Sequence, residues 1–402
     1  MKFFRQEYIK RIREGFYSAV YFNRTQQILV SEHNLTPVTM QIFQKQSNQT
    51  LCGIEEVVEL FSECAGFFEK KTFIKKFGEL KIEALKDGEV IGEWEPVMHI
   101  TGPYTYFAHL ESVYLGILAR RTRIATNTKH VVEAAGKKPV IFFADRFDYF
   151  LNQEGDGYAA KVGGVTGVAT DAQASWFGEK GIGTIPHALI AVNNGNTVKA
   201  AEQFARHYPK VPLIVLVDFD NDCVGTSLEV AKALGDKLYG VRLDTSEKLI
   251  DTSLQNDLTE GVTGAGDPRR APGALAKPSD GGGSRQDPEV IGPQNGTAAS
   301  QPAGRDPEIH GVNPRLVKNV REALNAHGFE KVKIVVSGGF NEEKIKKFEQ
   351  EHTPVDIYGV GSALVQGHAE FTADIVKVNG QEVAKFGRKF SSSKKLQAID
   401  TK

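Results

Sequence analysis

The chain has 402 residues, of which 41% are hydrophobic and 25% charged, and its formal net charge is -1. These values are ordinary for an enzyme of about two domains, and the balanced charge gives no indication of nucleic-acid binding. No uninterrupted apolar run approaches the length of a membrane span, and the charged first residues argue against a signal peptide. The three cysteines, Cys52, Cys64 and Cys223, form no CxxC pair and indicate neither a disulfide framework nor a zinc site. A reducing cytoplasm is therefore the expected location.

The first part of the chain mixes helices with isolated strands, which predicts an α+β domain. We expect helices over residues 6–25, 54–61 and 71–77, and strands over 38–44, 81–85 and 90–100. The tail carries a hairpin signal at Asn379-Gly380, behind an apolar alternating run. We expect this tail to pair with the sheet of the first domain, so that residues 1–111 and 367–402 together form one mixed domain.

From Pro139 onward, short apolar runs alternate with helical patterns, which predicts a parallel sheet covered by helices. The expected strands cover 139–143, 213–217, 240–243, 333–336 and 355–358, and the expected helices cover 197–207, 226–234, 314–327 and 341–352. Asn313 followed by Pro314 is a favourable helix start. About six or seven strands can be placed, fewer than the eight of a complete barrel. The prediction for residues 112–366 is an incomplete parallel α/β barrel.

One segment interrupts this pattern. Between Gly261 and His310 there is no Phe, Tyr or Trp, and proline, glycine, serine and alanine dominate. Such a composition buries too little apolar surface to order itself. We expect residues 261–310 to be either a disordered insertion or a stretch translated in a wrong reading frame.

Two glycine-rich turns follow the last expected strands. Ser337, Gly338 and Gly339 end one apolar run, and Gly361 and Ser362 end the next. Glycine lets backbone N–H groups approach an anion, and the last strands of an α/β barrel are the usual place for a phosphate. The sequence therefore predicts binding of a phosphorylated small molecule.

A histidine follows a short Gly-Thr turn in Gly183-Thr184-Ile185-Pro186-His187. His187 is a candidate nucleophile or acid–base group facing bound phosphate. The alternative is a capping or core histidine, and the residues alone favour that reading.

Charged side chains also follow the expected strands. Arg242 and Asp244 are two apart on one strand and point the same way, so Arg242 suits a carboxylate and Asp244 suits sugar hydroxyls or a metal. An ion pair between them is an equal alternative. Arg146 follows another strand and suits phosphate, with a salt bridge to Asp145 or Asp148 as the more favoured alternative.

Asp218 and Asp220 stand near the end of the strand over 213–217. Carboxylates at such a position hold Mg²⁺ through waters, so both are candidate ligands. Simple surface acidity explains them equally well. The EF-hand pattern is incomplete and calcium is discounted.

The ordered set of motifs resembles nicotinate phosphoribosyltransferase. The match runs in order along the chain, apart from residues 264–306. It rests on Tyr21–Thr25, Glu111–Gly116, Arg120–Thr122, Arg146–Tyr149, Gly155–Tyr158, Gly183–Ala188, Val217–Asp222, Arg242–Thr245, Ser337–Phe340 and Gly359–Ser362.

The resemblance implies a type II phosphoribosyltransferase fold with a mixed domain and an incomplete barrel. It also implies transfer from 5-phosphoribosyl pyrophosphate to nicotinate, giving nicotinate mononucleotide, coupled to ATP hydrolysis in NAD salvage. Mg²⁺ is the implied cofactor and ATP a co-substrate, and a homodimer or larger homo-oligomer is expected, with no nucleic-acid or membrane partner.

Residue roles follow from the same resemblance. His187 corresponds to the histidine that ATP phosphorylates. Tyr21, Thr184 and Arg242 correspond to positions near nicotinate, and Arg146 and Asp244 to positions near phosphoribosyl pyrophosphate. The turns Ser337–Gly339 and Gly361–Ser362 correspond to the 5′-phosphate site. Ala19 departs from the family pattern, because many relatives carry Asp there.

Three alternatives remain from the sequence. Another pyridine phosphoribosyltransferase would use nicotinamide or quinolinate, and quinolinate would need a more basic pocket because it has a second carboxylate. Pairing of Arg242 with a carboxylate would also disfavour nicotinamide. A non-catalytic nucleotide-binding relative is the remaining alternative; the long insertion motivates it, and the intact His187 and Arg242 argue against it.

Overall fold

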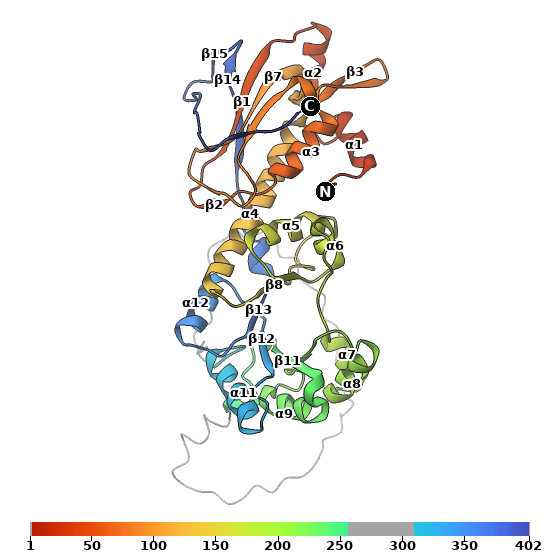
Figure 1. Ribbon diagram of the computed structural model, residues 1–402, viewed down its shortest axis with the longest axis vertical. Helices are drawn as coiled ribbons and strands as arrows, with labels where there is room; N and C mark the ends of the chain where they lie inside the picture. The colour runs from red at the N-terminus through yellow and green to blue at the C-terminus, as the bar shows by residue number, and fades with distance from the viewer. Residues whose placement is uncertain (1, 256–308, 402) are drawn as a thin grey trace, which may run out of the picture.

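The computed structural model describes residues 2–255 and 309–401, which form two parts along the long axis of the molecule (Figure 1). The first part is built around an antiparallel sheet with the strand order β15-β14-β1-β7-β5-β16. Its strands are β1 (Pro37–Gln44), β5 (Lys81–Ala84), β7 (Pro96–Pro103), β14 (Phe371–Val378), β15 (Gln381–Glu382) and β16 (Gln397–Ala398). Its other elements are α1 (Gln6–Arg13), α2 (Val20–Ser31), α3 (Ile54–Cys64), β2 (Gln49–Thr50), β3 (Gly66–Glu69), β4 (Thr72–Lys75) and β6 (Val90–Ile91).

The chain's tail completes this sheet. β14 pairs antiparallel with β1 along its whole length, from Phe371 opposite Gln44 to Val378 opposite Val38. β15 then returns as the short second arm of a hairpin on β14. The predicted pairing of the tail with the first sheet is therefore confirmed.

Three local expectations in this part are corrected. The predicted helix over 71–77 is wrong: β4 pairs with β3 in a hairpin whose turn contains Lys70 at φ 55°. The β-branched and aromatic residues of Thr72–Lys75 fit a strand better than a helix. The predicted helix over 6–25 is divided into α1 and α2 at Gly15, where φ is 71°. The predicted strand over 90–100 is likewise interrupted between β6 and β7, where Trp94 has φ 60°.

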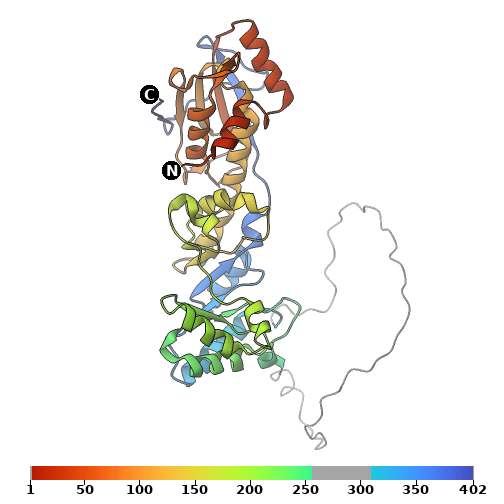
Figure 2. The same cartoon turned by 90° about the vertical axis from the view of Figure 1, so that its right-hand side faces the viewer.

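A long helix, α4 (Glu111–Ala135), connects the two parts. Figures 1 and 2 show it leaving the first part and running alongside the second. It contacts α3 and β14 on one side and α5 and α12 on the other. Because α4 packs in both cores, it fixes the two parts relative to each other.

The second part is a curled parallel sheet with the order β10-β11-β12-β13-β8-β9. All of its described pairings are parallel. The strands are β8 (Val140–Phe142), β9 (Gly167–Val168), β10 (Leu213–Leu216), β11 (Leu238–Leu243), β12 (Lys333–Val336) and β13 (Ile357–Val360). The expected strands and the incomplete parallel α/β barrel are confirmed, whereas the two-residue β9 is too short to give a sequence signal.

Helices cover the outside of this sheet: α5 (Gln153–Gly163), α6 (Asp171–Ala174), α7 (His187–Val192), α8 (Thr197–His207), α9 (Cys223–Leu234), α11 (Pro314–Ala326) and α12 (Glu342–Gln350). Side-chain caps fix several of their starts. Asn313 accepts a bond from the amide of Leu316, and Asn341 from that of Lys344. Such caps typically stabilise a helix by about 1 kcal/mol and set its entry angle.

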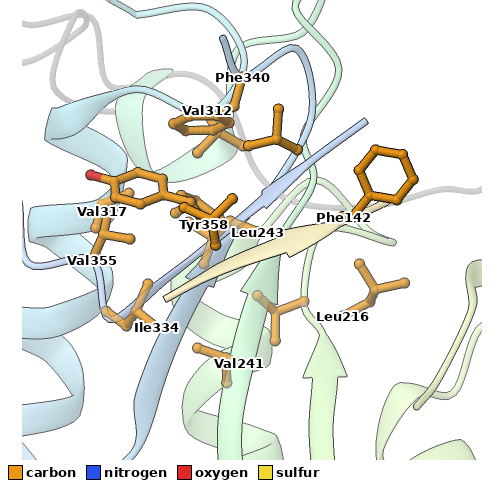
Figure 3. Packing of buried hydrophobic residues seen from close by; sticks show 14 of the residues in the cluster. Phe142, Leu216, Val241, Leu243, Val312, Val317, Ile334, Phe340, Val355 and Tyr358 are labelled. Atoms are coloured by element: carbon orange, nitrogen blue, oxygen red, sulfur yellow. The ribbon is translucent and has the colours of Figure 1, made fainter. Parts of the chain in front are cut away.

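Apolar side chains between the sheet and these helices form the core of the second part. Figure 3 shows Val241 and Ile334 on neighbouring strands, with Tyr358 and Val317 close by, and all four are buried. Burying such a side chain contributes roughly 1.5–3 kcal/mol each. The packed core therefore gives the carboxyl edge of the sheet a rigid base.

The curled sheet remains open between β9 and β10, which are its two edge strands. The chain from Asp171 to His207 crosses this opening and contributes α6, α7 and α8. Most of the predicted insertion over 261–310 lies outside the described residues. Its described flanks meet, because the Gly311 amide donates to the Leu249 carbonyl at 2.8 Å. None of the described helices combines the length and apolar character that a membrane crossing needs.

Candidate active site

A cavity of about 380 Å³ lies at the carboxyl edge of the parallel sheet. The ends of β8, β11, β12 and β13 line it, together with the segment that crosses the open side of the barrel. Nine predicted site residues line this cavity: Arg146, Thr184, Arg242, Asp244, Ser337, Gly338, Gly339, Gly361 and Ser362. The parallel arrangement explains this convergence, because all carboxyl ends reach the same edge.

The turn after β12 has the backbone geometry of an anion cradle. Gly338 and Gly339 have φ values of 85° and 66°, which side-chain-bearing residues rarely adopt. Within the described part of the chain, the amides of Gly338, Gly339 and Phe340 donate to no acceptor. Successive free N–H groups of this kind are suited to a phosphate.

The neighbouring turn after β13 is equally tight. A side chain on Gly361 would come within 2.5 Å of the Phe147 ring and 3.1 Å of the Phe143 carbonyl oxygen. Ser337 Oγ donates to Asp244 Oδ1 at 2.8 Å and ties the first turn to β11. The two turns thus form one small-residue floor at the predicted phosphate site.

Arg242 projects from β11 into the cavity with its guanidinium carbon 5.4 Å from the Phe143 ring centroid. Its Nη2 lies 3.8 Å from Asp244 Oδ2, beyond hydrogen-bond distance, and its buried Nε has no partner among the described residues. Burial lowers the pKa of Arg242, and the opposing influence of Asp244 is smaller. The guanidinium therefore has unused donors that suit a planar carboxylate.

His187 is the first residue of α7 and lies beside the cavity, next to the lining residue Pro186. Its Nε2 is 3.1 Å from both carboxylate oxygens of Asp218, which follows β10. The hydrogen bond to Asp218 raises the pKa of His187, whereas burial opposes the shift. The His187 side chain is 43% exposed, so it is not a core histidine.

The remaining predicted cavity residues have distinct surroundings. Arg146 lies in the exposed loop between β8 and α5 and forms no ion pair with a described residue. The expected alternative, a salt bridge to Asp148, is not formed, because Asp148 pairs with Arg120 at 2.6 Å. Thr184 Oγ1 donates to the carbonyl of Ile214.

Phe143 is a lining residue that the sequence analysis treated only as part of a strand. The sequence could have indicated this role, because Phe143 directly follows β8 and so lies at the carboxyl edge of the sheet. The aromatic ring beside Arg242 offers an apolar face for a flat heterocycle. Asp218 was also assigned differently, as a candidate magnesium ligand rather than a partner of His187.

Tyr21 lies apart from the other predicted residues. It stands on α2 in the first part of the molecule, is 63% exposed and does not line the cavity. No residue of α2 is buried, although the helix carries Val20, Phe22 and Ile28. Within one chain, the structure does not bring Tyr21 to the candidate site.

Asp218 and Asp220, the candidate magnesium ligands, do not line the cavity either. Asp220 is exposed, and Asp218 is 7% exposed and held by His187. The described residues contain no group of three or more His, Cys, Asp or Glu side chains suited to a metal ion. The assignment of these two carboxylates stays a prediction.

Comparisons with known proteins agree with this geometry. Residues 19–122 match the family described as "Quinolinate phosphoribosyl transferase, N-terminal domain". A crystal structure of nicotinate-nucleotide pyrophosphorylase from Pyrococcus furiosus is 28% identical and superposes with a TM-score of 0.71, over 99% of this chain and 85% of that one. The chain has the fold of the type II phosphoribosyltransferases.

Two further proteins similar to this chain are named after a phosphoribosyl transfer to nicotinate or nicotinic acid. A nicotinate phosphoribosyltransferase of Mycobacterium tuberculosis is 26% identical over 314 residues, which cover 76% of this chain and 55% of that protein. The chain thus spans about half the length of the curated relatives it matches. The human nicotinic acid phosphoribosyltransferase shares the fold at 15% identity, with a TM-score of 0.63 over 93% of this chain and 77% of that one. The names of these two proteins differ from that of the Pyrococcus furiosus protein, so a proposal for this chain must rest on the cavity itself.

Proposed function

We propose that this chain, which has the type II phosphoribosyltransferase fold, is a nicotinate phosphoribosyltransferase. It transfers the phosphoribosyl group of 5-phosphoribosyl pyrophosphate to the ring nitrogen of nicotinate, releasing pyrophosphate and forming nicotinate mononucleotide. The observation that carries the proposal is Arg242, a largely buried guanidinium with unused donors beside an aromatic ring in a cavity that also holds a phosphate cradle. One carboxylate satisfies this guanidinium, and nicotinate has one carboxylate.

Arg242 would orient the base more than activate it. A bidentate bond to the nicotinate carboxylate, with the ring against Phe143, would aim the ring nitrogen at the ribose. Nicotinamide is neutral and leaves the guanidinium without an anionic partner, which disfavours it. The same residue thus provides both positioning and selectivity.

The ribose end of the reaction would use the turns and Asp244. The free amides of the Gly338–Gly339 turn would hold the 5′-phosphate, and Asp244 lies beside them, bonded to Ser337 Oγ. Positive charge develops at the anomeric carbon when pyrophosphate leaves, and a nearby carboxylate stabilises it.

Magnesium belongs to the proposal as the ion that neutralises the pyrophosphate leaving group. Such an ion is usually held by one or two carboxylates together with substrate phosphates, so the absence of a larger acidic cluster among the described residues fits it. Asp145 and Asp244 line the cavity and are the carboxylates that would bind the ion there.

His187 supports the coupling to ATP within this proposal. Because Nε2 faces Asp218, the other ring nitrogen keeps its lone pair for attack on a γ-phosphate. A phosphorylated His187 beside the cavity would add charge near the pyrophosphate site, and its hydrolysis would link ATP consumption to NAD salvage.

A second copy of the chain is part of the proposal, because Tyr21 can reach a nicotinate site only from another molecule. The apolar residues Tyr17, Val20, Tyr21 and Ile28 are exposed on and before α2. A second exposed apolar group, Phe147, Tyr149, Phe150 and Leu151, lies in the loop that borders the cavity. These two surfaces would suit each other in a homodimer or larger homo-oligomer.

Quinolinate is the alternative base. Two observations favour it: the match to the quinolinate phosphoribosyl transferase family and the similarity to the Pyrococcus furiosus protein. The cavity argues against it: among the described residues that line it there are two arginines and two aspartates but no lysine. A dicarboxylate would need a more basic pocket. A cytoplasmic location also belongs to the proposal, since all three cysteines are buried and unpaired.

The test is an assay of the purified chain with nicotinate, nicotinamide and quinolinate, each with phosphoribosyl pyrophosphate and Mg²⁺, with and without ATP. We expect mononucleotide from nicotinate, stimulated by ATP, and little from the other two bases. Product from quinolinate with release of carbon dioxide would identify the alternative. No product from any base, with ligands still bound, would identify a non-catalytic relative.

A further inference from the structure

Two oppositely charged side chains flank the Gly338–Gly339 turn and have no role in the proposed reaction so far. Lys344 is the third residue of α12, and its amide bonds to the cap Asn341 at 2.8 Å. Its side chain folds back so that Nζ donates to the carbonyl of Gly338 at 3.2 Å and lies 4.5 Å from the Phe340 ring centroid. The lysine thus stabilises the turn through the Gly338 carbonyl.

The positive charge of Lys344 is weakly compensated. Its side chain is 22% exposed, and burial lowers its pKa. Its one acidic partner among the described residues is Glu247, whose Oε1 lies 4.0 Å away. A half-desolvated ammonium beside three free amides produces a local field that favours an anion.

Glu247 contacts the same turn at Gly339 and lies three residues beyond Asp244 in the chain. Its carboxylate occupies the space that a side chain on Gly339 would take, since an added Cβ would collide with Oε1. The Glu247 side chain is 66% exposed, so it is free to turn away into solvent. In this position its negative charge repels any anion that approaches the turn.

We propose that Lys344 is a positioning residue of the phosphate site and that Glu247 is its counter-charge. Lys344 fixes the Gly338 carbonyl and supplies positive charge, and Glu247 weakens anion binding until the incoming phosphate displaces it. This inference rests on the proposed function only in taking the turn as the site of a ribose 5′-phosphate.

The experiment is calorimetric titration of ribose 5-phosphate into the full chain, without nicotinate or ATP, at fixed low salt. Lys344→Met should weaken binding by about ten-fold or more, the scale of one charged hydrogen bond, and Lys344→Arg should retain most of the affinity. Glu247→Gln should tighten binding by roughly three-fold, because a repelling charge is removed. Lys346→Met is the matched control: Lys346 lies on the same helix, is exposed and pairs with Glu342 at 2.5 Å. It should leave the affinity unchanged.

The outcomes separate this inference from the proposed function. Equal affinities for Lys344→Met and Lys346→Met would overturn the role of Lys344, and weaker binding by Glu247→Gln would overturn that of Glu247. Failure of the unaltered chain to bind ribose 5-phosphate would overturn the phosphate site, and the proposed function with it. If Lys344→Met does not fold, retained affinity in Lys344→Arg, tighter binding by Glu247→Gln and unchanged binding by Lys346→Met together still test the charges at the turn.

Discussion

At the scale of single residues, His187 and Asp218 form a hydrogen-bonded dyad through which the proposed reaction with ATP would depend on pH. The Asp218 carboxylate raises the pKa of His187 above its ordinary value of 6.5, so the ring stays protonated to higher pH. The contribution of this pair to the free energy of unfolding is fully present below pH 6.5 and is lost as pH rises through the raised pKa of His187. Attack on ATP needs the neutral ring, so ATP hydrolysis should increase with pH through that same range.

Two substitutions test this dyad. His187→Ala should abolish ATP hydrolysis and the stimulation of product formation by ATP, while slow ATP-independent transfer remains. Asp218→Asn should move the acidic limb of the ATPase profile to lower pH, because the hydrogen-bonded anion is gone. The measurement is acid-labile phosphate from γ-labelled ATP over a pH series. As much label on His187→Ala as on the unaltered chain would show that another residue accepts the phosphate.

Arg242 is the residue that tests base recognition. Arg242→Lys keeps the charge but loses the planar fork, and the kcat/KM for nicotinate should fall by about 1–3 kcal/mol in transition-state terms. Steady-state kinetics with nicotinate and nicotinamide measure the loss and the change in preference. An unchanged kcat/KM for nicotinate would place the carboxylate contact elsewhere in the cavity.

At the scale of elements, α4 braces the loop that carries Arg146. The Arg120 guanidinium on α4 donates two hydrogen bonds to the buried Asp156 carboxylate of α5, at 2.7 and 2.8 Å. It donates a third hydrogen bond, at 2.6 Å, to Asp148 in the loop. Asp148→Asn should therefore raise the KM for phosphoribosyl pyrophosphate by about ten-fold, through misplacement of Arg146. The effect should vanish when Arg146 is already alanine, because the two substitutions then act on one contact.

The matched control for this element is Glu154→Gln, which removes the exposed pair of Glu154 with Arg5 and should change no kinetic constant. A double-mutant cycle on the KM for phosphoribosyl pyrophosphate provides the measurement, with thermal melts to compare stability. Additive effects of Asp148→Asn and Arg146→Ala would mean that the Arg120 network is structural only.

At the scale of the whole molecule, the exposed α2 predicts that each active site is shared between two copies. Tyr21→Ala and Arg242→Ala chains should each be nearly inactive alone. When the two variants are co-expressed, about half of the dimers should contain one copy of each, and one of the two sites in such a dimer is intact. Activity should therefore return to about a quarter of that of the unaltered protein. Sedimentation gives the assembly state. A monomeric chain in which Tyr21→Ala keeps full activity would contradict the shared site.

The sequence by itself determined the local features of this protein. Alternating apolar runs and helical patterns predicted the parallel sheet of the second part, and glycine turns after its strands predicted the phosphate floor. Arg242 and Asp244 were assignable because their spacing on one strand puts both side chains on one face. These properties depend on short-range periodicity, which a single sequence expresses directly.

The tertiary structure alone decided which distant groups meet. His187 and Asp218 are 31 residues apart, and only the crossing of the open barrel brings them within 3.1 Å. Lys344 and Glu247 meet in the same way across two strand ends. Long-range packing set both of these contacts, and no local pattern encodes them; for the same reason only the structure reveals that Tyr21 lies far from the cavity of its own chain. The helix predicted over 71–77 is a different case, because the strand-favouring residues of β4 and its hairpin with β3 are local features.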